Sequence, residues 1–191
     1  MNITFAPKGI LQIDEARIVY RNFEGAGSKY NREGDRNFSV VIPDRELTNE
    51  EVKSFMDIYT DARLVEDEDG VVLVYNDAKL ITLADALQSL NWNVRIKPPR
   101  DADDTLFMHL PVKVKFNDRG PRVYLKAGDN MTELDASTVK CLDRVDILNV
   151  DMDIRPYDYD VDELGRGTGR TAYLQSICVT QEFDRFADRY R

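Results

Sequence analysis

The chain has few of the residues from which cross-links, metal centres and catalytic sites are usually built. Its 191 residues include two cysteines and one histidine. Cys141 and Cys178 match neither a disulfide framework nor a metal-ligand spacing, so we expect two buried, reduced thiols, as in cytoplasmic proteins. His109 lies between Met108 and Leu110, and no catalytic motif ties a serine or cysteine to it. We therefore expect a structural histidine and no catalytic centre.

Long apolar runs are also lacking. No stretch approaches the roughly 18 residues that a membrane-spanning helix requires. The segment Met1–Leu11 lacks the basic and then apolar pattern of a secretory signal. We therefore expect no membrane contact and a cytoplasmic location. Hydrophobic residues make up 42% of the chain, which is sufficient to build the core of a single domain of this length.

Acidic residues are abundant towards the carboxyl end, but their spacing fits a calcium loop poorly. Asp158, Asp160 and Asp162 imitate the start of an EF-hand loop. Glu163 then stands where that loop requires glycine, and Gly169 stands where it requires a bidentate glutamate. We therefore expect no calcium site here.

Two other readings of this region concern catalysis and cofactors. The same carboxylates, with Asp151 and Asp153, would serve a metal-dependent nuclease, whereas alternating acids on a strand usually form its solvated face. The glycine-rich segment Gly165–Arg170 lacks the lysine and the following helix of a phosphate-binding loop. We expect a flexible connection between strands, with neither a metal nor a cofactor.

The net charge of −9 argues against a polyanionic partner only if the charge is spread evenly. Between Trp92 and Lys126 there are eight basic and four acidic residues, a local charge of +4 that leaves −13 for the rest of the chain. Salt at 0.1 M confines each electric field to about 10 Å. A basic surface on an acidic body can therefore still bind a polyanion.

Alternation of apolar and polar residues predicts a strand-dominated chain. The expected strands are Gly9–Arg21, Arg36–Ile42, Val71–Tyr75, Trp92–Lys97, Phe107–Phe116, Arg122–Lys126, Asp146–Pro156 and Arg170–Thr180. Helical spacing covers Leu47–Thr60, where Thr48 and Glu51 complete a capping box. Shorter helices are expected at Leu83–Leu90, at Ser137–Leu142 and from Glu182. The predicted fold is mainly β with helical insertions, and an OB-like five-stranded barrel with extra strands and short helices is one way to close it.

No repeat or linker divides the chain. We expect one OB-like domain over residues 1–180, with a helical insertion near 44–90, and a short C-terminal helix or tail over 181–191. In that last segment Phe183, Phe186, Ala187 and Tyr190 form one apolar stripe at helical spacing. A helix so short must dock to be ordered, either on its own domain or on a second subunit or other partner.

Basic side chains alternate with apolar ones in three neighbouring predicted strands. In Trp92–Lys97 the pleat places Arg95 and Lys97 opposite the apolar residues. The turn Asn117–Pro121 is short enough to join the next two strands as a hairpin. One face of that hairpin would then present Lys113, Lys115, Arg122, Tyr124 and Lys126. Like charges repel on a sheet, whereas a polyanion would be held by cations and by an aromatic ring that stacks on a base. A solvated face whose lysines guard a sheet edge is the alternative.

The aromatic residues divide between core and surface. Trp92 shares a face with Val94 and Ile96, and Phe38 lies on an apolar face, so both are expected in the core. Tyr124 lies on the basic face and is the best candidate for stacking. Tyr173 and Tyr20 are plausible, although their faces are ambiguous from the sequence.

Five blocks, in their order and spacing, carry a family resemblance across residues 36–181. They are Asn37–Asp44, Trp92–Arg100, Leu110–Phe116, Asp153–Asp158 and Gly169–Ile177. The chain resembles a family of phage and prophage single-stranded-DNA-binding proteins, and the resemblance implies an OB fold and a role in phage replication or recombination. Two features depart from it. The connection between Pro43 and Trp92 is longer than expected, and the carboxyl end is mixed in charge rather than acidic.

Together these observations predict sequence-tolerant binding of single-stranded DNA in the cytoplasm of a bacterial host, by a phage- or prophage-encoded protein without a cofactor. The residues expected to contact phosphates are Arg95, Lys97, Lys113, Lys115, Arg122 and Lys126. Tyr124 and Tyr173 are expected to stack on bases. The partners considered are single-stranded DNA, a second copy of the chain, and replication or recombination proteins. The alternatives are a phage structural or assembly protein whose basic face meets another protein, and the nuclease described above.

Overall fold

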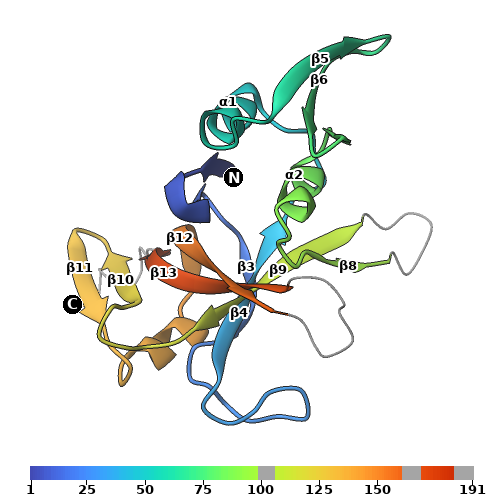
Figure 1. Cartoon of the computed structure of the whole chain (residues 1–191). Coiled ribbons are helices and arrows are strands. Elements are labelled where there is room, and N and C mark those ends of the chain that lie inside the picture. Colours follow the sequence, from blue (N-terminus) through green and yellow to red (C-terminus); the bar gives the residue numbers. More distant parts are fainter. Residues whose placement is uncertain (99–105, 161–168, 183–191) are drawn as a thin grey trace.

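The computed structural model describes residues 1–98, 106–160 and 169–182, and Figure 1 shows their arrangement. The fold is mainly β, as predicted. The larger sheet follows the strand order β1 (Asn2–Phe5), β2 (Leu11–Asp14), β12 (Ile147–Tyr159), β13 (Gly169–Gln181), β9 (Phe107–Val114), β4 (Arg36–Ile42) and β3 (Ile18–Asn22). Three further strands attach to it: β8 (Arg95–Lys97) to β9, β10 (Arg122–Ala127) to β13, and β11 (Asn130–Leu134) to β10.

The segment between β4 and β8 forms a separate layer at the top of Figure 1. It contains α1 (Asn49–Ile58), a three-stranded sheet of β5 (Arg63–Asp67), β6 (Gly70–Tyr75) and β7 (Ala78–Leu80), and then α2 (Leu83–Ser89). Two short 3₁₀ helices lie elsewhere, at Pro7–Gly9 and Val139–Asp143. The sheet path has ends at β1 and β3, and no strand pairing joins these two ends in the described residues. Closure into an OB-like barrel therefore stays a prediction.

Elements with strong local signals begin and end close to where the sequence predicts. Strand β4 has the predicted bounds, and α1 has the predicted capping box, in which Thr48 Oγ1 accepts from Glu51 N and Glu51 Oε1 accepts from Thr48 N. The predicted strand Gly9–Arg21 is instead two strands, β2 and β3. They are separated by a turn in which Glu15 adopts a left-handed φ of 54°. The short strands β1, β5, β7 and β11 were not predicted.

The predicted hairpin between β9 and β10 is wrong. Both strands pair in parallel with β13. Strand β9 pairs with it at Ala172 and Tyr173, and β10 pairs with it further along, from Ser176 onwards. The turn at 117–120 does form, through backbone hydrogen bonds between Asn117 and Gly120, but the chain then continues forward instead of reversing. The hairpin partner of β10 is β11.

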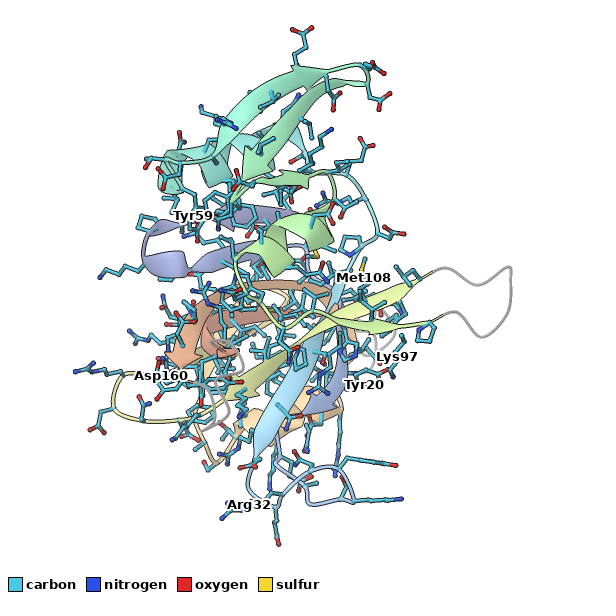
Figure 2. All side chains as sticks on the ribbon, turned by 45° about the vertical axis from the view of Figure 1, so that its right-hand side comes forward. Tyr20, Arg32, Tyr59, Lys97, Met108 and Asp160 are labelled. Atoms are coloured by element: carbon cyan, nitrogen blue, oxygen red, sulfur yellow. The ribbon has the colours of Figure 1, made fainter. Side chains whose placement is uncertain are left out.

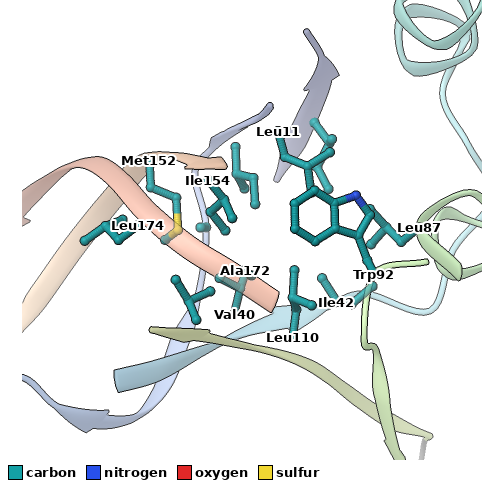
Figure 3. Packing of buried hydrophobic residues seen from close by; sticks show 14 of the residues in the cluster. Leu11, Val40, Ile42, Leu87, Trp92, Leu110, Met152, Ile154, Ala172 and Leu174 are labelled. Carbon is teal, nitrogen blue, oxygen red and sulfur yellow. The ribbon is translucent and has the colours of Figure 1, made fainter. Parts of the chain in front are cut away.

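The predicted core aromatics are buried. Figure 3 shows the Trp92 ring among Leu11, Ile42, Leu87 and Leu110. Trp92 is 3% exposed and Phe38 is 1% exposed. The predicted strand Trp92–Lys97 is shorter in the structure, where β8 begins at Arg95 and Trp92 lies before it. Ile96 is 48% exposed and does not share the buried face of Trp92. The α2 helix supplies Leu87 to this contact, so the insertion and the main sheet share one core.

The inserted layer is also attached to the first strand by polar contacts. Glu51 is 1% exposed, and its carboxylate accepts from Ile3 N at 3.2 Å and from Arg45 Nη1 at 2.6 Å. Phe5 N donates to Ser54 Oγ at 3.1 Å, and the rings of Phe5 and Phe55 meet edge to face. Burial raises the pKa of Glu51, but hydrogen bonds from Arg45 and the backbone outweigh it and hold the pKa below its usual value.

Three remaining predictions concern single features. Cys141 and Cys178 are free thiols, as expected, but both are half-buried rather than buried. The apolar stripe predicted from Phe183 onwards lies outside the described residues. None of the described helices has the length and apolar character needed to cross a membrane.

Candidate nucleic-acid interface

A groove with a volume of about 960 Å³ crosses the face of the larger sheet that points away from the core. Strands β3, β4, β8 and β9 form its floor, the start of β13 borders it, and the loop between β3 and β4 forms one wall. In β4, Phe38 and Val40 are buried in the core, whereas Asn37 and Ser39 alternate with them and face the groove. The groove is therefore built on the end of the larger sheet that holds β9, β4 and β3.

Five of the eight predicted binding residues line this groove, namely Arg95, Lys97, Lys113, Lys115 and Tyr173. They come together because β8 and β13 both pair with the edge of β9 that faces away from β4, at different points along it. Arg95 of β8 pairs with His109, and Tyr173 of β13 pairs with Lys113. All four cationic side chains are exposed, so their charge is available to a ligand.

Tyr20 forms an aromatic platform at one end of the groove, beside Lys97 (Figure 2). Lys97 Nζ donates to Tyr20 Oη at 2.7 Å and lies 4.7 Å from the centre of the ring. The Tyr20 ring also packs against His109, with centroids 5.4 Å apart, and remains 54% exposed. An exposed ring with a cation on it offers a base a stacking surface next to a phosphate ligand.

The face on which Tyr20 lies could not be assigned by alternation, since a bulge interrupts β3 at this residue. The pairing with β4 shifts between Val19 and Asn22, and Tyr20 adopts a left-handed φ of 53°. Bulges redirect a side chain from the face that simple alternation would assign to it. Positive φ is uncommon for a bulky residue and costs free energy, which is typical of functional positions.

His109 has the structural environment expected of it and also contributes to the floor of the groove. It is 6% exposed, and its Nδ1 lies 3.0 Å from Ser39 Oγ. Burial lowers the pKa of His109, and the charges of Lys97 and Arg95 lower it further. The ring is therefore neutral at pH 7.

Sequence reasoning missed Arg36 and Phe116, which also line the groove. The Arg36 guanidinium lies 5.4 Å from the centre of the Phe116 ring and donates from Nη2 to Ala136 O at 2.9 Å. By alternation Arg36 belongs with the core residue Phe38, so no periodicity signal points to it. Arg36 is the first residue of β4, where the side chain is least bound to the alternation of the strand. That position was the one sign in the sequence that Arg36 could face the groove.

Arg122, Tyr124 and Lys126 lie outside the groove because β10 continues past β9 instead of folding back on it. Tyr124 is half-buried and Lys126 is exposed. Arg122 Nε lies 3.3 Å from Glu133 Oε1, a hydrogen bond that raises the pKa of Arg122. The predicted single basic face is therefore two surfaces.

The two surfaces adjoin at Tyr173. A pocket beside β10 is lined by three guanidinium groups, those of Arg119, Arg122 and Arg155. Arg155 pairs with Tyr173 across β12 and β13, and its guanidinium lies 5.0 Å from the centre of the Tyr173 ring. Tyr173 also lines the groove, so cations and an aromatic ring continue from the groove to this pocket.

The carboxylates considered for a nuclease have other contacts. Asp158 forms an ion pair with Arg170 at 2.7 Å, and Asp151 accepts from Glu15 N at 2.9 Å. Burial raises the pKa of Asp153 despite a hydrogen bond from Ser176. Within residues 1–98, 106–160 and 169–182 no group of three potential metal ligands gathers. Asp162 and Gly165 lie outside the described residues.

Comparison with solved structures finds similar chains among single-stranded-DNA-binding proteins from bacteriophage Enc34. The C-terminal truncation of that protein has 13% identity and a TM-score of 0.45, with 96% of this chain and 92% of that chain covered. The complex of that protein with single-stranded DNA has 14% identity and a TM-score of 0.46, with 97% and 93% covered. Among curated proteins no match is found.

The sequence also matches a family model described as "Putative phage ssDNA-binding domain". The match covers residues 3–79 and 70–191. These two ranges include the inserted layer as well as the strands that form the groove. The chain therefore belongs to the family of phage single-stranded-DNA-binding domains.

Proposed function

We propose that this protein binds single-stranded DNA with little sequence preference, and that the strand lies in the groove across β8, β9 and β4. The observation that carries the proposal is the gathering of exposed cations and aromatic rings in one groove of a chain that belongs to this family. Cations that follow the backbone and rings on which bases stack are the two components of sequence-tolerant single-strand binding.

Each component has named residues. Arg95, Lys97, Lys113 and Lys115 contact phosphates, because these side chains are exposed and line the groove. Tyr20, which sequence reasoning weighed without committing to it, stacks on a base at one end. Tyr173 does so at the other, where it borders both surfaces.

A longer strand continues past Tyr173 onto the second surface. There Arg122 and Lys126 contact phosphates and Tyr124 contacts a base, as the sequence predicts, but on a separate segment of the DNA. We place the protein in phage DNA replication or recombination in the cytoplasm of the bacterial host, where single strands are exposed.

The direct test is a fluorescence-anisotropy titration of labelled oligo-dT and of a matching duplex. Lys113→Glu/Lys115→Glu should abolish single-strand binding and leave the thermal midpoint nearly unchanged, because exposed substitutions usually cost within about 0.5 kcal/mol. Lys8→Glu/Lys140→Glu is the matched control, since it changes net charge equally at exposed positions outside the groove. Equal loss of affinity in both double variants, or equal affinity for duplex and single strand, would contradict the proposal.

A further inference from the structure

The negative charge of the protein is concentrated in the inserted layer. Residues 44–90 contain twelve acidic and four basic side chains, a net charge of −8 within a chain total of −9. In Figure 2 the free end of the β5–β6 hairpin, at the top, carries several side chains that end in oxygen. This layer repels the phosphates that the DNA groove attracts, so its charge favours a basic ligand over a nucleic acid.

The apolar face of the small sheet extends beyond the area that α1 covers. Leu64 pairs with Leu73 across β5 and β6, and Val71 lies two residues before Leu73, so all three side chains point to the same face. Leu73 is 3% exposed, whereas Leu64 is 52% and Val71 is 67% exposed. Part of this face is therefore packed and part is open to solvent.

The open part forms a groove of about 870 Å³ between α1 and the small sheet. Half-buried Val52 and Met56 border it from α1, and Ile81, which is 50% exposed, lies at its edge. Exposed apolar side chains that gather in one concave patch mark an interaction site more often than scattered ones do.

Carboxylates surround this apolar floor. The acidic residues that line the groove are Glu46, Asp57, Asp67 and Asp69, against two lysines, Lys53 and Lys79. Lys79 Nζ lies 3.0 Å from Asp67 Oδ2, and this contact lowers the pKa of Asp67. Asp57 and Asp69 are exposed, so their charges face an approaching ligand.

We propose that this groove, lined by Leu64, Val71 and Ile81, binds an amphipathic segment of another protein that carries lysine or arginine beside its apolar side chains. Its apolar side chains cover the exposed floor, as a helix does when it lies in a hydrophobic groove. Its cations meet the surrounding carboxylates, and this complementarity favours basic over acidic partners and speeds association. The site and the DNA groove share no lining residue, so the protein can hold DNA and a partner at once.

The experiment uses the full chain and a fluorescein-labelled 18-residue peptide of leucine and lysine arranged as an amphipathic helix. A second peptide keeps every lysine and replaces each leucine with serine. We expect the leucine–lysine peptide to bind at least tenfold more tightly than the serine–lysine peptide. Leu64→Ser/Val71→Ser should weaken the leucine–lysine peptide by about tenfold or more. Met131→Ser/Leu148→Ser is the matched control, because these side chains are similarly exposed outside the groove.

The contribution of charge is tested separately. Asp57→Asn/Asp69→Asn should weaken binding of the leucine–lysine peptide and reduce its salt dependence, whereas Asp118→Asn/Asp129→Asn, exposed outside the groove, should change neither. Three outcomes would overturn the proposal: no binding of either peptide, equal binding of both, or equal effects of groove and control variants. Binding of oligo-dT by Leu64→Ser/Val71→Ser should equal that of the unmodified protein. If the DNA proposal is wrong, the variants at Lys113 and Lys115 will instead bind oligo-dT as tightly as the unmodified protein does.

Discussion

Salt should weaken DNA binding by an amount that can be estimated from the groove. Five basic residues line it: Arg36, Arg95, Lys97, Lys113 and Lys115. Each phosphate contact to a single strand contributes about −0.7 to the slope of log affinity against log salt. If all five are engaged, the slope is about −3.5 by that rule, and the affinity for oligo-dT falls roughly 100-fold between 50 and 200 mM salt.

Neutralising two of these contacts should change the slope by a predictable amount. With Lys113→Gln/Lys115→Gln the slope should fall to about −2, and the same change in salt should cost only about 20-fold in affinity. Glutamine keeps most of the side-chain length, and both positions are exposed, so the fold should be unaffected. The assay is fluorescence anisotropy of labelled oligo-dT at five or more salt concentrations, with circular dichroism as the check on folding.

Two results would refute the reasoning. A slope near zero in the unmodified protein would mean that the groove does not contact phosphates. A slope that is unchanged in Lys113→Gln/Lys115→Gln but reduced in Arg122→Gln/Lys126→Gln would place a short oligonucleotide on the surface beside β10. The groove would then not be the primary site.

Four further predictions concern single residues. Tyr20→Ala should cost about 1–3 kcal/mol of binding to oligo-dT, measured by anisotropy, because an exposed ring is lost from the groove. Trp92→Ala should cost about 3–5 kcal/mol of unfolding free energy in a urea titration, since the ring is 3% exposed. Glu51→Ala should cost about 1.5–3 kcal/mol in the same titration, because it removes the buried acceptor of hydrogen bonds from Arg45, which is itself 27% exposed, whereas exposed Glu50→Ala should change it by about 0.5 kcal/mol at most. For His109, burial and two nearby cations lower the pKa in the folded protein. The contribution of His109 to the free energy of unfolding is therefore complete above its ordinary pKa of about 6.5. It decreases as the pH falls below that value, because the histidine of the unfolded chain takes up a proton before that of the folded protein does. The thermal midpoint, measured from pH 7.5 to 5, should decrease with falling pH, and this decrease should be smaller in His109→Gln.

The sequence by itself determined what depends on neighbours along the chain. The bounds of β4 follow from alternation, and the start of α1 follows from the capping box of Thr48 and Glu51. Burial of Phe38 follows from the apolar face of β4. Trp92 is buried as predicted, but by Leu11 and Leu110 from distant segments and by Leu87 of α2, and not by a strand face shared with Ile96. Alternation also assigned Arg95, Lys97, Lys113 and Lys115 to exposed faces correctly, because a pleat reverses side-chain direction at every residue.

Only the tertiary structure decided which exposed faces meet. Tyr20 and Lys97 are 77 positions apart, and they touch because β3 and β8 flank the same two central strands. Conversely, Arg122 follows Lys113 closely in sequence yet lies on another surface, because β10 pairs with β13 and not with β9. Alternation states which way a side chain points, but a strand can pair with any other strand that offers matching backbone groups. That choice depends on contacts between distant segments, and it is what separates one predicted basic face into a groove and an adjoining pocket.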